Sequence, residues 1–346
     1  MRTYGAVLRP HAYEIFLLVS FVLAHFAVSH FAGLNLVFEL AASSTFAIAE
    51  ILAKCLLLGV ALRVAGGLVT GSARGYLRQI LRWPWWLESA RLILFGALAT
   101  HVYSFLKVLM PRLTTRNADA FLWELDRMIL FGHSPSVLLL ELFHEPFALS
   151  TVDWMYSYVF NGTLWTVFVL ALSSPSQRIR VSFVGAKAML WVVGAALYYT
   201  LPSLGPAYRF EEVWHGAMKH MPFTFATLQA LMGNYVVVLG KREGIVNFLF
   251  GIGAFPSLHV AFQVFVALWA RRFTRAGGAV AIAAAMIIFT GSIVTGWHYL
   301  ADSLAGVVLA VLAYVIMFRV YRIGRWIRLF RVYRRPRPRL NRLMTL

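Results

Sequence analysis

Two histidines and one aspartate are the residues of this chain whose types and spacing could do chemistry. His298 and Asp302 lie four apart in Gly-Trp-His-Tyr-Leu-Ala-Asp. On a helix they share one face, where the carboxylate can accept a hydrogen bond from one imidazole nitrogen. Such a partner fixes the tautomer of a nucleophilic or basic histidine and stabilises the cation that forms during reaction. His259 ends Gly-Ala-Phe-Pro-Ser-Leu-His, at the start of a different apolar segment.

Both histidines are expected at the amino-terminal ends of helices, on the same side of the protein. The N–H groups and positive dipole ends of both helices would then point at one place, which suits a phosphate. Pro256 and Ser257 are typical first-turn and cap residues. We therefore predict that two imidazoles flank one phosphorus atom. The pH dependence of kcat should be bell-shaped with limbs near the histidine range, because one imidazole must be neutral while the other is protonated.

The elements that must position these residues are membrane helices. The 346 residues are 60% hydrophobic and 13% charged, with a mean hydropathy of +0.71, which is outside the range of ordinary soluble domains. We expect an all-α, polytopic membrane helical bundle with about eight spans of roughly 20 residues each. The expected spans are 13–32, 45–69, 90–110, 151–172, 183–201, 256–270, 278–296 and 300–320.

Charge predicts the orientation of these spans. The chain has 32 Lys and Arg against 14 Asp and Glu, a balance that would indicate nucleic-acid binding in a soluble protein. Here the basic residues fall mostly in loops and in the tail on one side, where positive charge marks the cytoplasmic face. We therefore expect no nucleic-acid partner, an integral protein of the cell inner or plasma membrane, cytoplasmic termini, and an active site on the extracytoplasmic face.

Four regions are expected along the chain. They are N-terminal spans in 1–110, an outer interfacial segment in 111–150, a catalytic helical core in 151–320 and a basic cytoplasmic tail in 321–346. Within 118–143 we expect one or two amphipathic helices lying on the outer face of the bilayer. Their apolar residues are Phe121, Leu122, Leu125, Met128 and Ile129, beside the charged Asp119, Glu124, Asp126 and Arg127.

Other kinds of site are possible for the same residues. His and Asp can bind zinc, but no cysteine pair or Glu-x-x-His pattern accompanies them, so we expect no metal and no other cofactor. Intramembrane His and Asp also form proton relays in transporters, and a non-catalytic scaffold would tolerate loss of His298. The polar residues cluster at one membrane face instead of crossing the membrane, which favours an enzyme.

The two histidine blocks resemble those of the type 2 phosphatidic acid phosphatase superfamily, whose catalytic blocks are Pro-Ser-Gly-His and Ser-Arg-x5-His-x3-Asp. This chain has Pro256-Ser257-Leu258-His259 and His298-x3-Asp302. Over roughly 195–320 it looks like the inositol phosphorylceramide synthase-like (aureobasidin-resistance) branch. The resemblance implies that His298 attacks phosphorus to give a phosphohistidine and that Asp302 orients His298. It also implies that His259 protonates the leaving oxygen and then acts as base on the acceptor.

The chain departs from the superfamily pattern in two places. Residues 198–207, Tyr-Tyr-Thr-Leu-Pro-Ser-Leu-Gly-Pro-Ala, replace the Lys-x6-Arg-Pro block, and Ser292 stands where an arginine is expected. Helix ends, hydroxyls or other cations must therefore meet the phosphate charge. The candidate substrate-binding residues are Ser257, Tyr199, Ser292, Lys241 and Arg242, with Arg209 and Lys219 behind them.

The preferred hypothesis is a membrane lipid phosphotransferase. It would move a phosphorylated head group, for example phosphoinositol, from a phospholipid donor to a lipid acceptor through a phosphohistidine. With water as the acceptor, the same site would make a lipid phosphate phosphatase. The sequence does not separate the two, and only the resemblance to the synthase branch favours transfer.

Overall fold

The computed structural model describes residues 11–32, 37–241, 246–248 and 250–333, and the secondary structure within these ranges is entirely helical. The helices are α2 (Ala12–Ala32), α3 (Val37–Val69), α4 (Ala73–Ile80), α5 (Trp83–Leu113), α6 (Asp119–Ile129), α7 (Pro135–Leu142), α8 (Pro146–Leu172), α9 (Gln177–Leu197), α10 (Pro206–Arg209), α11 (Glu211–Met218), α12 (Pro222–Val238), α13 (Leu258–Ala270), α14 (Arg275–Val294) and α15 (Leu300–Tyr333).

The long helices match the expected spans. Six segments of the described chain are long and apolar enough to cross a membrane: Thr45–Val69, Trp83–Leu113, Pro146–Leu172, Gln177–Leu197, Arg275–Val294 and Leu300–Met317. Two shorter apolar helices, Tyr13–Ala27 and Leu258–Ala270, occupy the other two expected positions. The prediction of an all-α polytopic membrane bundle is confirmed.

Helix α13 is shorter than a full membrane span. Its 13 residues rise about 20 Å, roughly two thirds of a bilayer core of about 30 Å. The irregular segment 250–257 precedes it, and residues Gly251 to Ala254 are buried in the bundle. Irregular backbone is tolerated at membrane depth where protein surrounds it or where it lines a cavity.

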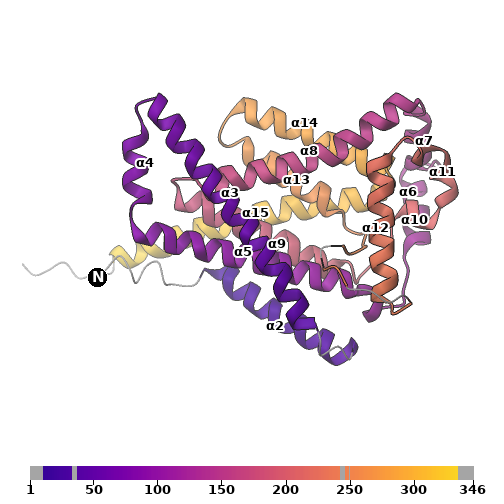
Figure 1. The fold of residues 1–346 in the computed structure, drawn as a ribbon, viewed down its shortest axis with the longest axis horizontal. Helices are drawn as coiled ribbons and strands as arrows, with labels where there is room; N and C mark the ends of the chain where they lie inside the picture. The colour runs from indigo at the N-terminus through magenta and orange to yellow at the C-terminus, as the bar shows by residue number, and fades with distance from the viewer. Residues whose placement is uncertain (1–10, 33–36, 242–245, 249, 334–346) are drawn as a thin grey trace, which may run out of the picture.

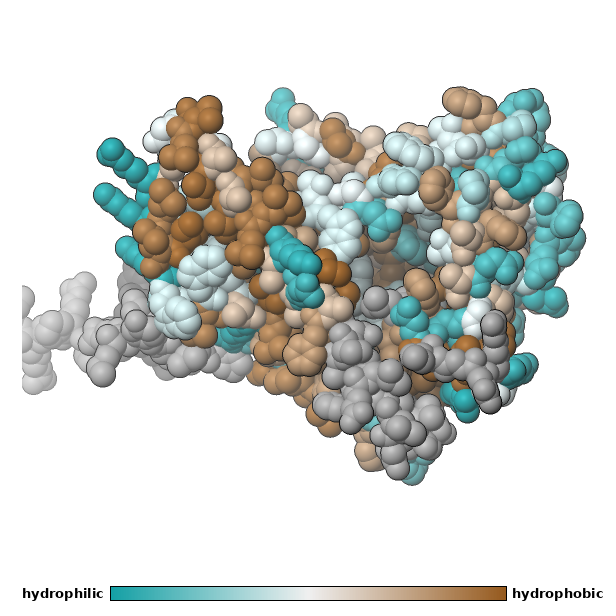
Figure 2. Space-filling view, viewed as in Figure 1, coloured by the Kyte–Doolittle hydropathy of each residue, from teal (hydrophilic) through white to brown (hydrophobic). Residues whose placement is uncertain are grey.

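The two ends of the bundle differ. Figure 1 shows the long helices side by side, with α4 at one end and α6, α7, α10 and α11 at the other, while α12 crosses in front of that second end. In Figure 2, hydrophobic surface covers the part of α3 nearest α4, and hydrophilic residues gather at both ends of the molecule. This distribution is the one expected of a protein whose middle lies in lipid.

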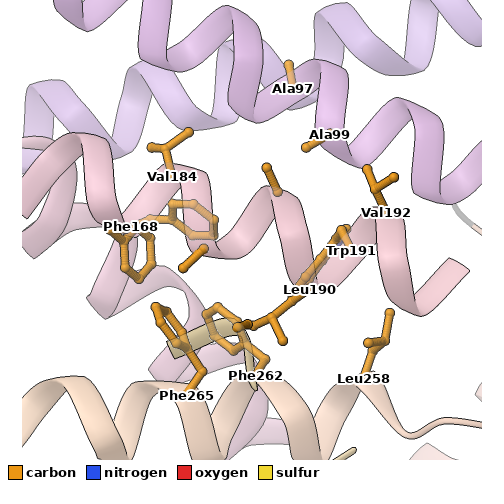
Figure 3. Packing of buried hydrophobic residues seen from close by; sticks show 14 of the residues in the cluster. Ala97, Ala99, Phe168, Val184, Leu190, Trp191, Val192, Leu258, Phe262 and Phe265 are labelled. Atoms are coloured by element: carbon orange, nitrogen blue, oxygen red, sulfur yellow. The ribbon is translucent and has the colours of Figure 1, made fainter. Parts of the chain in front are cut away.

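The core that holds the bundle together is centred on α9 (Figure 3). Its Leu190 is fully buried, and Phe262 of α13 and Ala97 and Ala99 of α5 are buried around it. Lipid removes the hydrophobic drive between helices, so close van der Waals packing, helped by small residues such as these alanines, stabilises the contact. This packing fixes α13, and therefore His259, relative to the rest of the bundle.

A glycine sets α15 against the start of α13. A Cβ atom at Gly306 would lie 2.4 Å from the carbonyl oxygen of Ser257, so only glycine fits this contact. One turn earlier on α15, the carbonyl of Asp302 accepts a hydrogen bond of 3.0 Å from the backbone N–H of Ser257. The helices that carry His259 and Asp302 are thereby held together at their amino-terminal ends.

Candidate active site

The two histidines meet at the end of the bundle that carries α6, α10 and α11. His259 is the second residue of α13, and His298 lies in the turn between α14 and α15. The Nδ1 atom of His259 is 3.2 Å from the Nε2 atom of His298. His298 is buried, and His259 is half-buried. The expectation that the two imidazoles lie at one place is confirmed, but His298 precedes α15 by two residues instead of beginning that helix.

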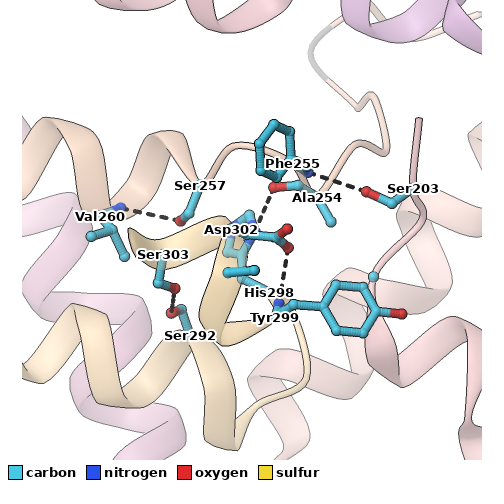
Figure 4. Close-up of polar contacts among 12 residues, drawn as sticks. Ser203, Ala254, Phe255, Ser257, Val260, Ser292, His298, Tyr299, Asp302 and Ser303 are labelled. Atoms are coloured by element: carbon cyan, nitrogen blue, oxygen red, sulfur yellow. Dashed lines mark hydrogen bonds and ion pairs between the residues drawn. The ribbon is translucent and has the colours of Figure 1, made fainter. Parts of the chain in front are cut away.

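The tautomer of His298 is set by a backbone carbonyl (Figure 4). The Nδ1 atom of His298 lies 2.9 Å from the carbonyl oxygen of Ala254, which can only accept, so Nδ1 carries the hydrogen. The lone pair of Nε2 then faces His259, whose Nδ1–H donates to it. Ser203 holds Ala254 in place, because its carbonyl accepts from the Ala254 N–H at 3.0 Å and its hydroxyl accepts from the Phe255 N–H at 3.2 Å.

Asp302 does not make the direct hydrogen bond to His298 that the spacing predicted. Its Oδ2 atom lies 3.7 Å from Nδ1 of His298, and it accepts a hydrogen bond of 2.9 Å from the backbone N–H of Tyr299. Its Oδ1 atom is buried with no hydrogen-bond partner among the described residues. The carboxylate therefore caps the first turn of α15, and it can stabilise a positive charge on His298 without orienting the ring directly.

Burial keeps the imidazole of His298 neutral. Desolvation lowers the pKa of His298 to about 3, and the positive charge of Lys107 lowers it further, while the hydrogen bond to Ala254 raises it. The imidazole is consequently neutral at ordinary pH. An imidazole whose Nε2 carries a lone pair and no proton is the form that can act as a nucleophile.

Helix α6 holds the histidine turn through a buried carboxylate. Asp126 accepts hydrogen bonds from the backbone N–H groups of Leu300, at 2.7 Å, and Ala301, at 2.8 Å. Burial raises the pKa of Asp126 to about 6, although these two hydrogen bonds lower it. The expectation of one or two helices in this segment is confirmed, since α6 and α7 are both present, but α6 buries Asp126 and exposes Phe121.

A second buried carboxylate on α6 holds the segment that replaces the missing Lys-x6-Arg-Pro block. Asp119 accepts from the N–H groups of Leu204 and Gly205, both at 3.0 Å, and from the hydroxyl of Tyr299 at 3.0 Å. Gly205 has φ +112°, which other residues rarely adopt, and a Cβ atom there would lie 2.8 Å from the carbonyl oxygen of Trp297. Asp119 therefore ties this segment to the turn that carries His298.

The histidine pair opens into a cavity of about 620 Å³. Its walls include Tyr103 and Lys107 of α5, and parts of α8, α12 and segment 250–253. Tyr156 of α8 also lines it, with its ring beside that of His259 and a hydroxyl that has no hydrogen-bond partner among the described residues. A volume of this size holds a lipid head group.

The comparison with known families bears on this site. A family model described as the PAP2 superfamily matches residues 120–316. The chain belongs to the PAP2 superfamily. No curated protein and no solved structure matches. The match runs from α6 to α15 and includes both histidines, so the superfamily part of the resemblance is confirmed, and membership supports phosphatase-type enzyme chemistry in a membrane.

The hydroxyls expected to bind substrate in this PAP2 protein lie outside the cavity lining. Ser257 is the buried N-cap of α13 and accepts from the backbone N–H of Val260. The hydroxyl of Tyr199 donates to the carbonyl of Leu106 at 2.6 Å. Ser292 is buried, and its hydroxyl donates to the carbonyl of Phe289. Each hydroxyl therefore has a structural partner.

The cations expected to bind substrate also lie away from the cavity. Lys241 is exposed, beyond the end of α12, and does not line the cavity. Arg242 lies outside the described residues. Arg209 stacks on the ring of Phe210, and Lys219 lines a separate groove on the outer helices. None of the three described side chains lines the cavity beside the histidine pair.

Sequence reasoning missed the roles of four groups of this PAP2 site: Lys107, the carbonyl of Ala254, and the carboxylates of Asp119 and Asp126. A lysine inside an apolar span is costly, and that cost was a signal available in the sequence. No sequence pattern marks a particular backbone carbonyl. Within the described ranges, no three His, Cys, Asp or Glu side chains lie close enough together to hold a metal ion.

Proposed function

We propose that this PAP2 protein is a lipid phosphotransferase that moves a phosphorylated head group, such as phosphoinositol, from a phospholipid to a lipid acceptor. The observation that carries the proposal is the contact between His259 Nδ1 and His298 Nε2 at the bottom of the cavity. A phosphate entering the cavity would replace this hydrogen bond and lie between the two nitrogens.

Each nitrogen then has one role in the first half-reaction. The lone pair of His298 Nε2 attacks phosphorus, forming a P–N bond while the P–O bond to the lipid alcohol breaks. His259, protonated on both ring nitrogens, gives its Nδ1 proton to the leaving oxygen and becomes neutral. The carboxylate of Asp302, 3.7 Å from Nδ1 of His298, stabilises the positive charge that the ring acquires.

The second half-reaction reverses these roles. His259 takes the proton of the acceptor hydroxyl, the acceptor oxygen attacks phosphorus, and the P–N bond breaks to restore the neutral His298. An acceptor that is a lipid alcohol gives transfer, and water gives hydrolysis. The resemblance to the inositol phosphorylceramide synthase-like branch supports transfer.

The walls of the cavity support a lipid substrate. Tyr158 of α8 and Phe223 of α12 line it and are also exposed, with 50% and 41% of their surfaces accessible. Apolar side chains that belong to both the cavity and the outer surface give acyl chains a route between α8 and α12. Asp153 of α8 fixes the start of α12 by accepting from the backbone N–H groups of Phe223 and Thr224, both at 2.9 Å.

We place the site on the extracytoplasmic face. The basic stretches at residues 74–91, 177–180 and 271–275 belong to the loops and helix ends opposite to α6, α10 and α11 (Figure 1). Short basic loops stay in the cytoplasm. The orientation supports a substrate that is reached from the outer leaflet.

The test combines purified full-length protein with candidate phospholipids that carry a labelled phosphate and with lipid alcohols. Mass spectrometry and phase partition then show whether the label reaches a second lipid or water. His298→Ala should abolish turnover, and the exposed His144→Ala should keep it. Equal product from wild type and His298→Ala would remove His298 as the nucleophile, and label found only in water would replace transfer by hydrolysis.

A further inference from the structure

The phosphate charge cannot be met by the amino-terminal end of α15. The first-turn N–H groups of Leu300 and Ala301 are bonded to Asp126, and that of Tyr299 is bonded to Asp302. These backbone donors are therefore occupied by carboxylates of the protein itself. A negatively charged ligand in the cavity needs a donor or cation from another element.

Lys107, near the carboxyl-terminal end of α5, is the one lysine or arginine among the described residues that line the cavity. Its Nζ atom donates to the hydroxyl of Tyr103 at 3.1 Å. The Nζ atom also lies 5.5 Å and 5.3 Å from the ring centres of Tyr103 and Tyr198. In the described part of the chain, no carboxylate forms an ion pair with Lys107.

The position of this ammonium group is fixed, and it retains donors. The side chain packs along the segment that leads to Ala254, because a Cβ atom at Gly251 would lie 3.0 Å from Cγ of Lys107 and one at Gly253 would lie 3.4 Å from Cε. A lysine ammonium has three N–H donors. One is used by Tyr103, which leaves two for the oxygens of a ligand in the cavity.

We propose that Lys107 binds the non-bridging oxygens of the phosphate while His298 and His259 lie on the attacking and leaving sides. The proposal rests on the proposed function, since it takes phosphate as the reacting group. It assigns the anion-binding role to α5, whereas the family match covers only residues 120–316. The first membrane spans would then form part of the active site.

The first test measures binding of orthovanadate, a phosphate analogue, to the detergent-purified full-length protein by calorimetry, without reference to turnover. Lys107→Met should weaken binding by about 10- to 100-fold, the effect of losing one charge-assisted hydrogen bond. Lys107→Arg should stay within a few-fold of wild type. Lys241→Met, which removes an exposed lysine outside the cavity, should leave binding unchanged.

The second test needs no variant. Saturating orthovanadate should protect Lys107 of the wild-type protein from acetylation by acetic anhydride, and it should leave Lys241 reactive, as seen by peptide mass spectrometry.

The outcomes separate this proposal from the proposed function. Equal acetylation of Lys107 with and without vanadate, or wild-type vanadate affinity in a folded Lys107→Met, would overturn the role of Lys107 while lipid transfer stands. Vanadate binding that depends on Lys107 in a protein without lipid turnover would support the anion site and refute the transferase. If Lys107→Met does not fold, the acetylation experiment decides.

Discussion

Replacing Asp126 by alanine should damage the active site without touching a catalytic group. The carboxylate lies on α6, yet its two oxygens accept the N–H groups of Leu300 and Ala301, which follow His298 by two and three residues. Alanine removes both acceptors and leaves two buried donors without partners. The turn that orients His298 is then free to move.

The size of the effect follows from the two hydrogen bonds. Each unsatisfied buried group costs about 1–3 kcal/mol of folding free energy. Removing the carboxylate also removes its desolvation penalty, which offsets part of this cost. We therefore expect the free energy of unfolding to fall by about 2–4 kcal/mol. A displacement of roughly 1 Å at a reacting group can reduce turnover about 100-fold. We therefore expect kcat to fall by about 10- to 100-fold, with a smaller change in KM.

The dependence of folding stability on pH gives a second prediction, with a defined direction. Because the pKa of Asp126 is about 6 in the folded protein and about 3.9 when unfolded, the folded state binds the extra proton first as the pH falls. The wild-type protein should therefore gain about 1 kcal/mol of stability between pH 7 and pH 5 from this group. Asp126→Ala lacks the group, so the stability difference between the two proteins should widen at pH 5.

Chemical denaturation in detergent micelles at pH 7 and pH 5, together with lipid turnover, measures both effects. Glu124→Ala is the matched control, because Glu124 lies on the same helix but is exposed and pairs only with the exposed Arg127. Exposed pairs contribute at most about 1 kcal/mol. The reasoning fails if Asp126→Ala is as stable and as active as Glu124→Ala, or if the difference narrows on acidification.

Three further predictions test neighbouring contacts. Gly306→Ala should lower the melting temperature and the turnover, since its methyl group would meet the carbonyl of Ser257 at 2.4 Å; normal activity would show that α13 and α15 can separate without harm. Asp153→Ala should raise KM for lipid more than it lowers kcat, because Asp153 fixes α12 at the cavity wall through Thr224; steady-state kinetics with a short-chain and a long-chain donor would measure the split. In contrast to the limbs near the histidine range that the sequence suggested, kcat/KM should lack an acidic limb near pH 6.5, because the pKa of His298 is about 3. A profile from pH 4 to pH 9 measures this, and a clear loss of activity between pH 7 and pH 6 would contradict it.

The helices and the meeting of the two histidines were predictable from sequence for a simple physical reason. A span of about 20 apolar residues is forced by the thickness of the bilayer, and charged loops fix which ends of the spans share a side. His259 and His298 begin apolar segments that start on the same side. Their proximity therefore followed from topology, and the 3.2 Å contact confirms it.

The partners of the histidines were not predictable in the same way. The spacing of His298 and Asp302 favoured a direct hydrogen bond, but at the start of a helix the backbone N–H of Tyr299 competes for the same carboxylate. The amphipathic pattern of α6 suggested a charged face in solvent, whereas Asp119 and Asp126 are buried. Pattern alone does not distinguish a solvated carboxylate from one that caps a distant backbone.

These buried carboxylates change what the rest of the site must supply. An exposed helix end offers free N–H donors to a phosphate, but here Asp126 and Asp302 occupy the donors at the start of α15. The arrangement gives His298 a rigid position and at the same time removes a ready-made anion site. In the cavity, α5 presents Lys107, the cation that we propose binds the phosphate. A chain that kept the residues of the family match and lost α5 would retain both histidines and still lack the cation that holds the phosphate for attack.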